Sequence, residues 1–169
     1  MNIHPVFVHF PIAFLTIYAI AELFRFKKLK ELSWFFPAKF VLLLVGTIGA
    51  FFALGTGEFG EAEFSSARAI IHVHEDAATV ATTIFCILLA SYLIAGIDSK
   101  WGTRIATAPY GKVWSAVSGI FRTVFSAPVV VALALAGLVA ITVTGALGGA
   151  IVYGPDADPV VSFVYSLFF

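Results

Sequence analysis

The sequence predicts an all-α integral membrane protein, a four-helix bundle in a single domain of residues 1–169. Of the 169 residues, 60% are hydrophobic and only 12% are charged, and the mean hydropathy of +1.00 exceeds that of water-soluble domains. A spanning helix needs about 20 apolar residues, because each residue adds ~1.5 Å and the hydrocarbon layer is about 30 Å thick. Four stretches meet this requirement, residues 5–24, 36–57, 69–97 and 127–153.

Each expected span has sequence features that support its assignment. The first contains Pro11, which should bend the helix, and a basic run follows it, the reverse of a cleavable signal peptide. From Phe40 onward the second carries no charged residue. The third follows a polar stretch in which Ser65 or Ser66 could cap its first turn. The fourth carries no charged residue up to Val152, so its whole length suits the hydrocarbon.

Two shorter segments complete the expected architecture. Residues 110–122 place apolar side chains mostly at helical spacing with polar ones between them, which predicts an amphipathic helix in the membrane interface. Residues 160–169 are apolar but too few to span the bilayer. We expect this tail to lie at the outer surface or to pack on a partner.

The basic residues predict the orientation, because loops rich in Lys and Arg stay cytoplasmic. Nine of the ten lie between the first and second spans or between the third and fourth, namely Arg25, Lys27, Lys28, Lys30, Lys39, Lys100, Arg104, Lys112 and Arg122. Only Arg68 lies on the other side. We therefore expect a multi-pass protein of the cytoplasmic (inner) membrane with both termini facing outward. The formal net charge of zero gives no reason to expect a nucleic-acid partner.

All four histidines, His4, His9, His72 and His74, fall at the outward ends of the first and third spans. At about 100° per residue, His4 and His9 lie about 140° apart around the helix axis, and His72 and His74 about 160° apart. Neither pair shares a face, so one histidine from each helix is the economical pairing. His9 and His74 reach a similar depth in their helices. Histidines on facing helices can hold a metal or a haem iron between them.

Three interpretations of this cluster stay open: one b-type haem, a non-haem metal ion, or no ligand at all. Copper or zinc is conceivable because Glu75 and Asp76 directly follow His74, and carboxylates can join imidazoles around a small ion. Cys86 is the single cysteine. With no second cysteine in the sequence, an internal disulfide, a thiolate zinc site and the cysteine-pair attachment of a c-type haem are excluded.

Residues 4–13, His-Pro-Val-Phe-Val-His-Phe-Pro-Ile-Ala, resemble the opening motif of a family of small bacterial four-helix membrane proteins, the domain of unknown function 2231. Residues 145–154 look like the Gly-Gly-x-x-Val-Tyr segment at the outer end of that family's last helix. His74, followed by the small residues Ala77 and Ala78, is similar to a histidine that leads into the family's third helix. The resemblance covers nearly the whole chain.

The resemblance implies a b-type haem within a membrane electron-transfer system. Carried over by position, His9 and His74 become the axial ligands, with His4 and His72 close by. Relatives often carry a histidine in the last helix where Ala146 stands in this chain. The resemblance therefore implies neither a ligand from the fourth span nor a second haem.

The leading functional prediction is a non-enzymatic, cytochrome b-like electron-transfer subunit that holds one haem b near the outer face. Its partner would be a periplasmic or extracellular c-type cytochrome, or a quinone reached from the bilayer. The alternatives are a copper- or zinc-binding membrane protein and a structural subunit of a larger complex. A transporter is less favoured, because the hydrocarbon-depth parts of the spans lack charged residues. Ser91 and Ser126 have no histidine and acid nearby in the sequence, so no hydrolase triad is indicated.

Overall fold

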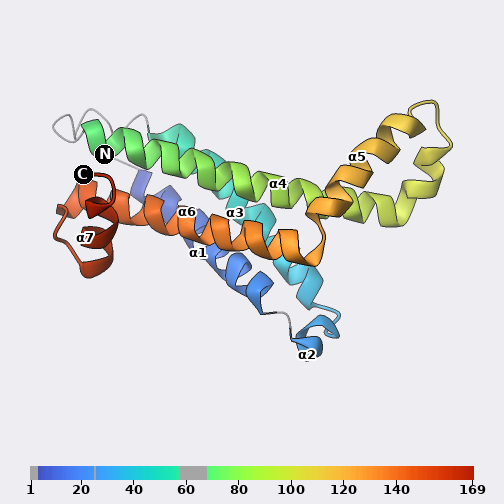
Figure 1. The fold of residues 1–169 in the computed structure, drawn as a ribbon, viewed down its shortest axis with the longest axis horizontal. Coiled ribbons are helices and arrows are strands. Elements are labelled where there is room, and N and C mark those ends of the chain that lie inside the picture. Colours follow the sequence, from blue (N-terminus) through green and yellow to red (C-terminus); the bar gives the residue numbers. More distant parts are fainter. Residues whose placement is uncertain (1–3, 25, 58–67) are drawn as a thin grey trace.

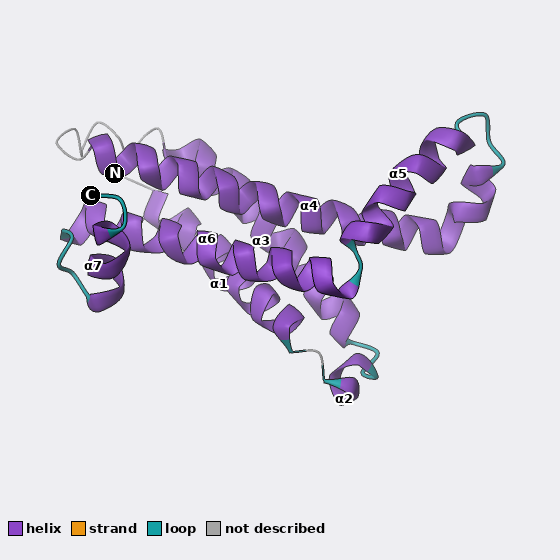
Figure 2. Ribbon diagram, viewed as in Figure 1, coloured by secondary structure: helices purple, strands orange, loops and turns teal. Residues whose placement is uncertain are grey.

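The computed structural model describes residues 4–24, 26–57 and 68–169 of the chain. The helices are α1 (His4–Leu23), α2 (Lys27–Lys30), α3 (Phe35–Gly57), α4 (Arg68–Ala106), α5 (Gly111–Val124), α6 (Ala127–Tyr153) and α7 (Pro159–Ser166). The described residues contain helices, turns and short loops but no strand (Figure 2), which confirms the predicted all-α class. By length and composition, α1, α3, α4 and α6 can each cross a membrane.

The four long helices form a bundle, and both termini lie at the same end of it (Figure 1). α1 packs mainly on α3, and α4 packs mainly on α6. Contacts of α1 with α6 and of α3 with α4 join these two pairs. α1 and α4 are therefore diagonal to one another, each flanked by α3 and α6. A ligand held between α1 and α4 would consequently lie inside the bundle.

Small residues bring the helices of each pair close together. The buried core includes Leu15 of α1, Leu43 of α3 and Phe85 of α4, each at most 1% exposed. An added Cβ at Gly46 of α3 would lie 2.6 Å from Leu15 Cδ2, and one at Gly137 of α6 would lie 2.8 Å from Phe85 Cζ. Glycine at these two positions therefore makes room for a large side chain of the neighbouring helix, as is usual between membrane helices.

α4 is longer than the sequence analysis predicted. The third helix was expected over residues 69–97, but α4 continues to Ala106. Hydropathy marks where the apolar part of a helix ends, whereas the next residue that breaks the helix is Pro109. With 39 residues at ~1.5 Å each, α4 is about 58 Å long, well beyond the ~30 Å of hydrocarbon.

The segment expected as an amphipathic helix over residues 110–122 forms α5. α5 returns along the C-terminal part of α4, and the two form a helical hairpin that projects beyond the other long helices (Figure 1). An added Cβ at Gly111 would overlap the carbonyl oxygen of Ala106. Glycine is thus what lets α5 begin so close to the end of α4.

The apolar C-terminal tail forms α7, which packs on α6 of its own chain. Val161 and Val164 are buried against residues that include Leu147 of α6. Asp158 caps the helix, because its side chain accepts hydrogen bonds from the backbone amides of Val160 and Val161 at 2.7 and 3.0 Å. The tail therefore packs on its own chain. The sequence had predicted that it would lie at the outer surface or pack on a partner.

The close contact at Gly46 can be tested with a matched pair of variants. Gly46→Ala places a methyl group against Leu15, which is fully buried, whereas Gly96→Ala adds one where no atom lies within 4 Å. Both gain the same helix propensity, so their difference reports packing. We expect Gly46→Ala to unfold with a free energy about 1–3 kcal/mol lower than Gly96→Ala in mixed detergent micelles. Equal stability would show that α1 and α3 can move apart without cost.

Candidate functional site

Two of the four predicted histidines come within electrostatic reach of one another. They are His4 of α1 and His74 of α4, and both are partly buried. The side chains of His9 and His72 are exposed. This electrostatic link joins one histidine from each helix, as expected, and the residue of α1 that it involves is His4; the pairing of His9 with His74, which the sequence and the family resemblance favoured, stays a prediction.

His74 is oriented by α6. Its Nδ1 lies 2.9 Å from the carbonyl oxygen of Thr144. Because a carbonyl oxygen can only accept, Nδ1 carries the proton and donates, and the lone pair of the ring is on Nε2. Because Gly148 has no side chain, the His74 ring can pack closely against α6; an added Cβ there would lie 3.3 Å from His74 Cε1. The ring is therefore held in the tautomer that ligates through Nε2.

His4 is oriented in a similar way by α3. Its Nδ1 lies 3.1 Å from Thr56 Oγ1, and the Thr56 hydroxyl donates to the carbonyl oxygen of Phe52 at 2.9 Å. The same hydroxyl lies 3.1 Å from the carbonyl oxygen of Ala53, so with its hydrogen directed to a backbone carbonyl its oxygen accepts from His4 when Nδ1 carries the proton. His4 precedes the apolar span Val6–Leu23, and burial lowers its pKa, opposed in part by a hydrogen bond to the backbone of Ala53. The neutral form, which binds metals, is favoured.

The donor set suits a group that needs two protein ligands. Within the described residues, no cluster of three or more His, Cys, Asp or Glu side chains could hold a metal ion. Glu75 Oε2 lies 3.8 Å from Nδ1 of His72, whose side chain is exposed at the surface. A haem iron takes four nitrogens from its own macrocycle and needs only axial ligands from the protein. The two Nε2 atoms could supply these from diagonal helices, beside the small residues Gly57 and Gly148.

Two cavities lie elsewhere in the bundle. One, of about 400 Å³, is lined mainly by α3 and α4 and includes Thr82 and Cys86. The other, of about 320 Å³, lies between α1, α6 and α7 and includes Thr142 and Gly145. Neither is lined by a histidine.

A buried polar cluster at the opposite end of the bundle was missed by the sequence analysis. Glu22 of α1 is 1% exposed, forms an ion pair with Lys39 of α3 at 2.8 Å, and accepts a hydrogen bond from the Tyr92 hydroxyl of α4. Glu22 and Lys39 lie at the ends of the expected spans 5–24 and 36–57, where charged residues are ordinary, so hydropathy gave no sign that they pair. One available signal was spacing, because Glu22 follows His4, and Tyr92 follows His74, by 18 residues, which is five turns and about 27 Å.

These features define a class, the small multi-pass membrane proteins built on a four-helix bundle. Within that class, the chain matches the family described as "Predicted membrane protein (DUF2231)" over residues 1–156, and it belongs to this family. The resemblance noted for residues 4–13 and 145–154 is thereby confirmed at the level of the family. Neither the curated proteins nor the solved structures gave a significant match.

The buried cluster makes a prediction about stability. Lys39→Met leaves the Glu22 carboxylate buried without its countercharge, and we expect the free energy of unfolding to fall by roughly 3–5 kcal/mol. The double variant Glu22→Gln/Lys39→Met removes both charges and should recover most of that loss. Lys28→Met, at an exposed basic residue of α2, is the control and should change stability by less than about 0.5 kcal/mol. The idea fails if Lys39→Met is as stable as Lys28→Met.

Proposed function

We propose that the protein is a b-type haem-binding subunit of a membrane electron-transfer system, without catalytic activity of its own. One observation carries the proposal: His4 and His74 come within electrostatic reach of one another from diagonal helices, and a neighbouring helix orients each ring through a contact at Nδ1. Metal-ligating histidines in proteins usually have this second hydrogen bond, which fixes the tautomer and raises the basicity of the ring.

In this function the chain would bind the haem and adjust its reduction potential. When bound, haem supplies the one-electron chemistry. His4 and His74 would hold its iron, and Thr56 and the Thr144 carbonyl would orient the two rings. Their hydrogen bonds to Nδ1 make the imidazoles stronger donors, which favours the oxidised iron. His9 and His72, both exposed at the same end, could contact the edge of the group or a partner protein.

The place of the site suggests where electrons would enter and leave. The histidine pair lies at the end of the bundle that holds both termini, and the distribution of basic residues supports an orientation in which this end faces outward from the cytoplasmic (inner) membrane. A periplasmic or extracellular c-type cytochrome, or a quinone in the bilayer, would be the partner within a larger complex.

One observation favours a second candidate, a non-haem copper or zinc site. Neither described cavity adjoins the histidines, and a single ion needs less room than a macrocycle. Such an ion would have to complete its coordination with water or with a ligand from a partner, because no third protein donor stands with the pair among the described residues.

A visible spectrum of the purified protein, supplied with haem during expression, tests the proposal. We expect the α and Soret bands of a low-spin b-type haem after reduction with dithionite. His4→Ala and His74→Ala should each convert the spectrum to high spin or abolish haem binding, because each removes one axial ligand. His9→Ala and His72→Ala are matched controls and should retain the low-spin spectrum.

The other outcomes each point elsewhere. Loss of low-spin haem in His9→Ala but not in His4→Ala would restore the pairing predicted from the sequence. A protein that lacks a Soret band but contains copper or zinc by elemental analysis would be the non-haem metal protein. If the protein contains neither haem nor metal, the electron-transfer proposal fails, and the remaining interpretation is a structural subunit of a larger complex.

The proposed orientation has its own test. In a Cys86→Ala background, single cysteines at Asp156 and at Lys28 occupy exposed positions at opposite ends of the bundle. We expect a membrane-impermeant maleimide to label Asp156→Cys in intact cells and to spare Lys28→Cys until the cells are broken. The opposite pattern would place the histidine pair on the cytoplasmic side.

A further inference from the structure

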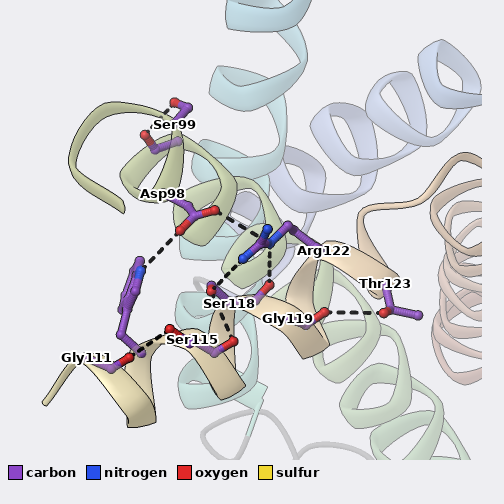
Figure 3. Close-up of polar contacts among 10 residues, drawn as sticks. Asp98, Ser99, Gly111, Ser115, Ser118, Gly119, Arg122 and Thr123 are labelled. Carbon is purple, nitrogen blue, oxygen red and sulfur yellow. Dashed lines mark hydrogen bonds and ion pairs between the residues drawn. The ribbon is translucent and has the colours of Figure 1, made fainter. Parts of the chain in front are cut away.

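The hairpin formed by residues 93–124, the end of α4 together with α5, has an unusual distribution of polar and apolar groups. Its polar side chains meet between the two helices (Figure 3). Asp98 accepts a hydrogen bond from Trp114 Nε1 at 3.1 Å and lies 3.6 Å from the Arg122 guanidinium. Arg122 also donates to Ser118 Oγ at 3.2 Å, and Ser118 is fully buried. Asp98 therefore joins the two helices by polar contacts, which we call the polar seam, and the Arg122 side chain at its edge is 63% exposed.

The outer surface of the same hairpin carries large apolar side chains. Trp101, Tyr110, Val113 and Ile120 are 45%, 62%, 67% and 64% exposed. A hairpin in water would do the reverse, burying these groups and exposing the seam. Polar groups inside and apolar groups outside suit an element whose surroundings are at least partly apolar.

The charges of the hairpin indicate what surrounds it. The hairpin has four basic side chains and the single acid Asp98. Because Asp98 pairs with Arg122, the excess positive charge lies on Lys100, Arg104 and Lys112. Lys100 Nζ lies 4.9 Å from the centre of the Trp101 ring. Exposed tryptophan and tyrosine next to lysine and arginine are typical of segments at the level of lipid headgroups.

From this combination we propose that the 93–124 hairpin binds anionic phospholipid headgroups of the leaflet at its own end of the bundle. The apolar residues enter the interface, and the lysines and arginines contact the phosphates. The spanning helices tether the hairpin next to this surface, so its entropic cost of association is small. The inference is independent of the histidine pair and of haem.

An environment-sensitive fluorophore tests this directly. Val113→Cys in the Cys86→Ala background gives one labelling site on the exposed face of α5. The labelled full-length protein in detergent is titrated with short-chain phosphatidylglycerol or with phosphatidylcholine of the same chain length. We expect a blue shift that saturates at lower concentration with phosphatidylglycerol. Lys100→Gln and Lys112→Gln should each raise the apparent Kd for phosphatidylglycerol about fivefold, whereas Lys28→Gln, outside the hairpin, should not.

Three results would overturn the proposal. An equal response to both lipids would mean that the hairpin does not recognise anionic headgroups. No blue shift with either lipid would mean that Val113 faces water. A fluorophore already blue-shifted before lipid is added, with cross-links between Val113→Cys chains, would mean that a second copy of the chain covers this face.

Discussion

Inside a membrane bundle an ionised carboxylate needs a countercharge, and Glu22 finds one in Lys39, with the Tyr92 hydroxyl as a further donor. These three residues come from α1, α3 and α4, so one buried cluster fixes three helices relative to one another. α1 and α4 are diagonal and share few contacts elsewhere. His4 and His74 lie five turns, about 27 Å, from Glu22 and Tyr92 along α1 and α4, so the cluster sets the relative position of the two helices from the end opposite the histidines.

At the other end of the bundle, hydrogen bonds to flanking helices replace direct contact between α1 and α4. His74 is held by the Thr144 carbonyl of α6, and His4 by Thr56 of α3. Each imidazole is therefore carried by one helix and oriented by a hydrogen bond to a second helix. All four long helices contribute to the arrangement of two side chains, which explains how so small a bundle could present a defined pair of nitrogen ligands.

The sequence predicted the all-α class and the apolar spans well, because hydropathy and length are the properties that a bilayer selects. It predicted the end of α4 poorly, since the signal at Ile97 is the end of the apolar run and the helix itself continues to Ala106. Within the candidate site, the sequence predicted one histidine from each of two helices. It favoured His9 on α1 and gave no sign that Thr56 orients His4, because that contact depends on how α1 is rotated against α3. Glu22 and Lys39 were overlooked because paired charges at helix ends look like ordinary loop charges.

The spacing of 18 residues on both α1 and α4 limits how this protein can evolve. Inserting or deleting one residue between His4 and Glu22 would turn one of them by about 100° around α1, away from its partners. The same holds between His74 and Tyr92 on α4. Substitutions can accumulate along these stretches, but changes in length cannot, unless they arrive as compensating pairs. Homologues that retain both clusters should therefore align through α1 and through this part of α4 without gaps, while loops such as residues 107–110 are free to vary in length.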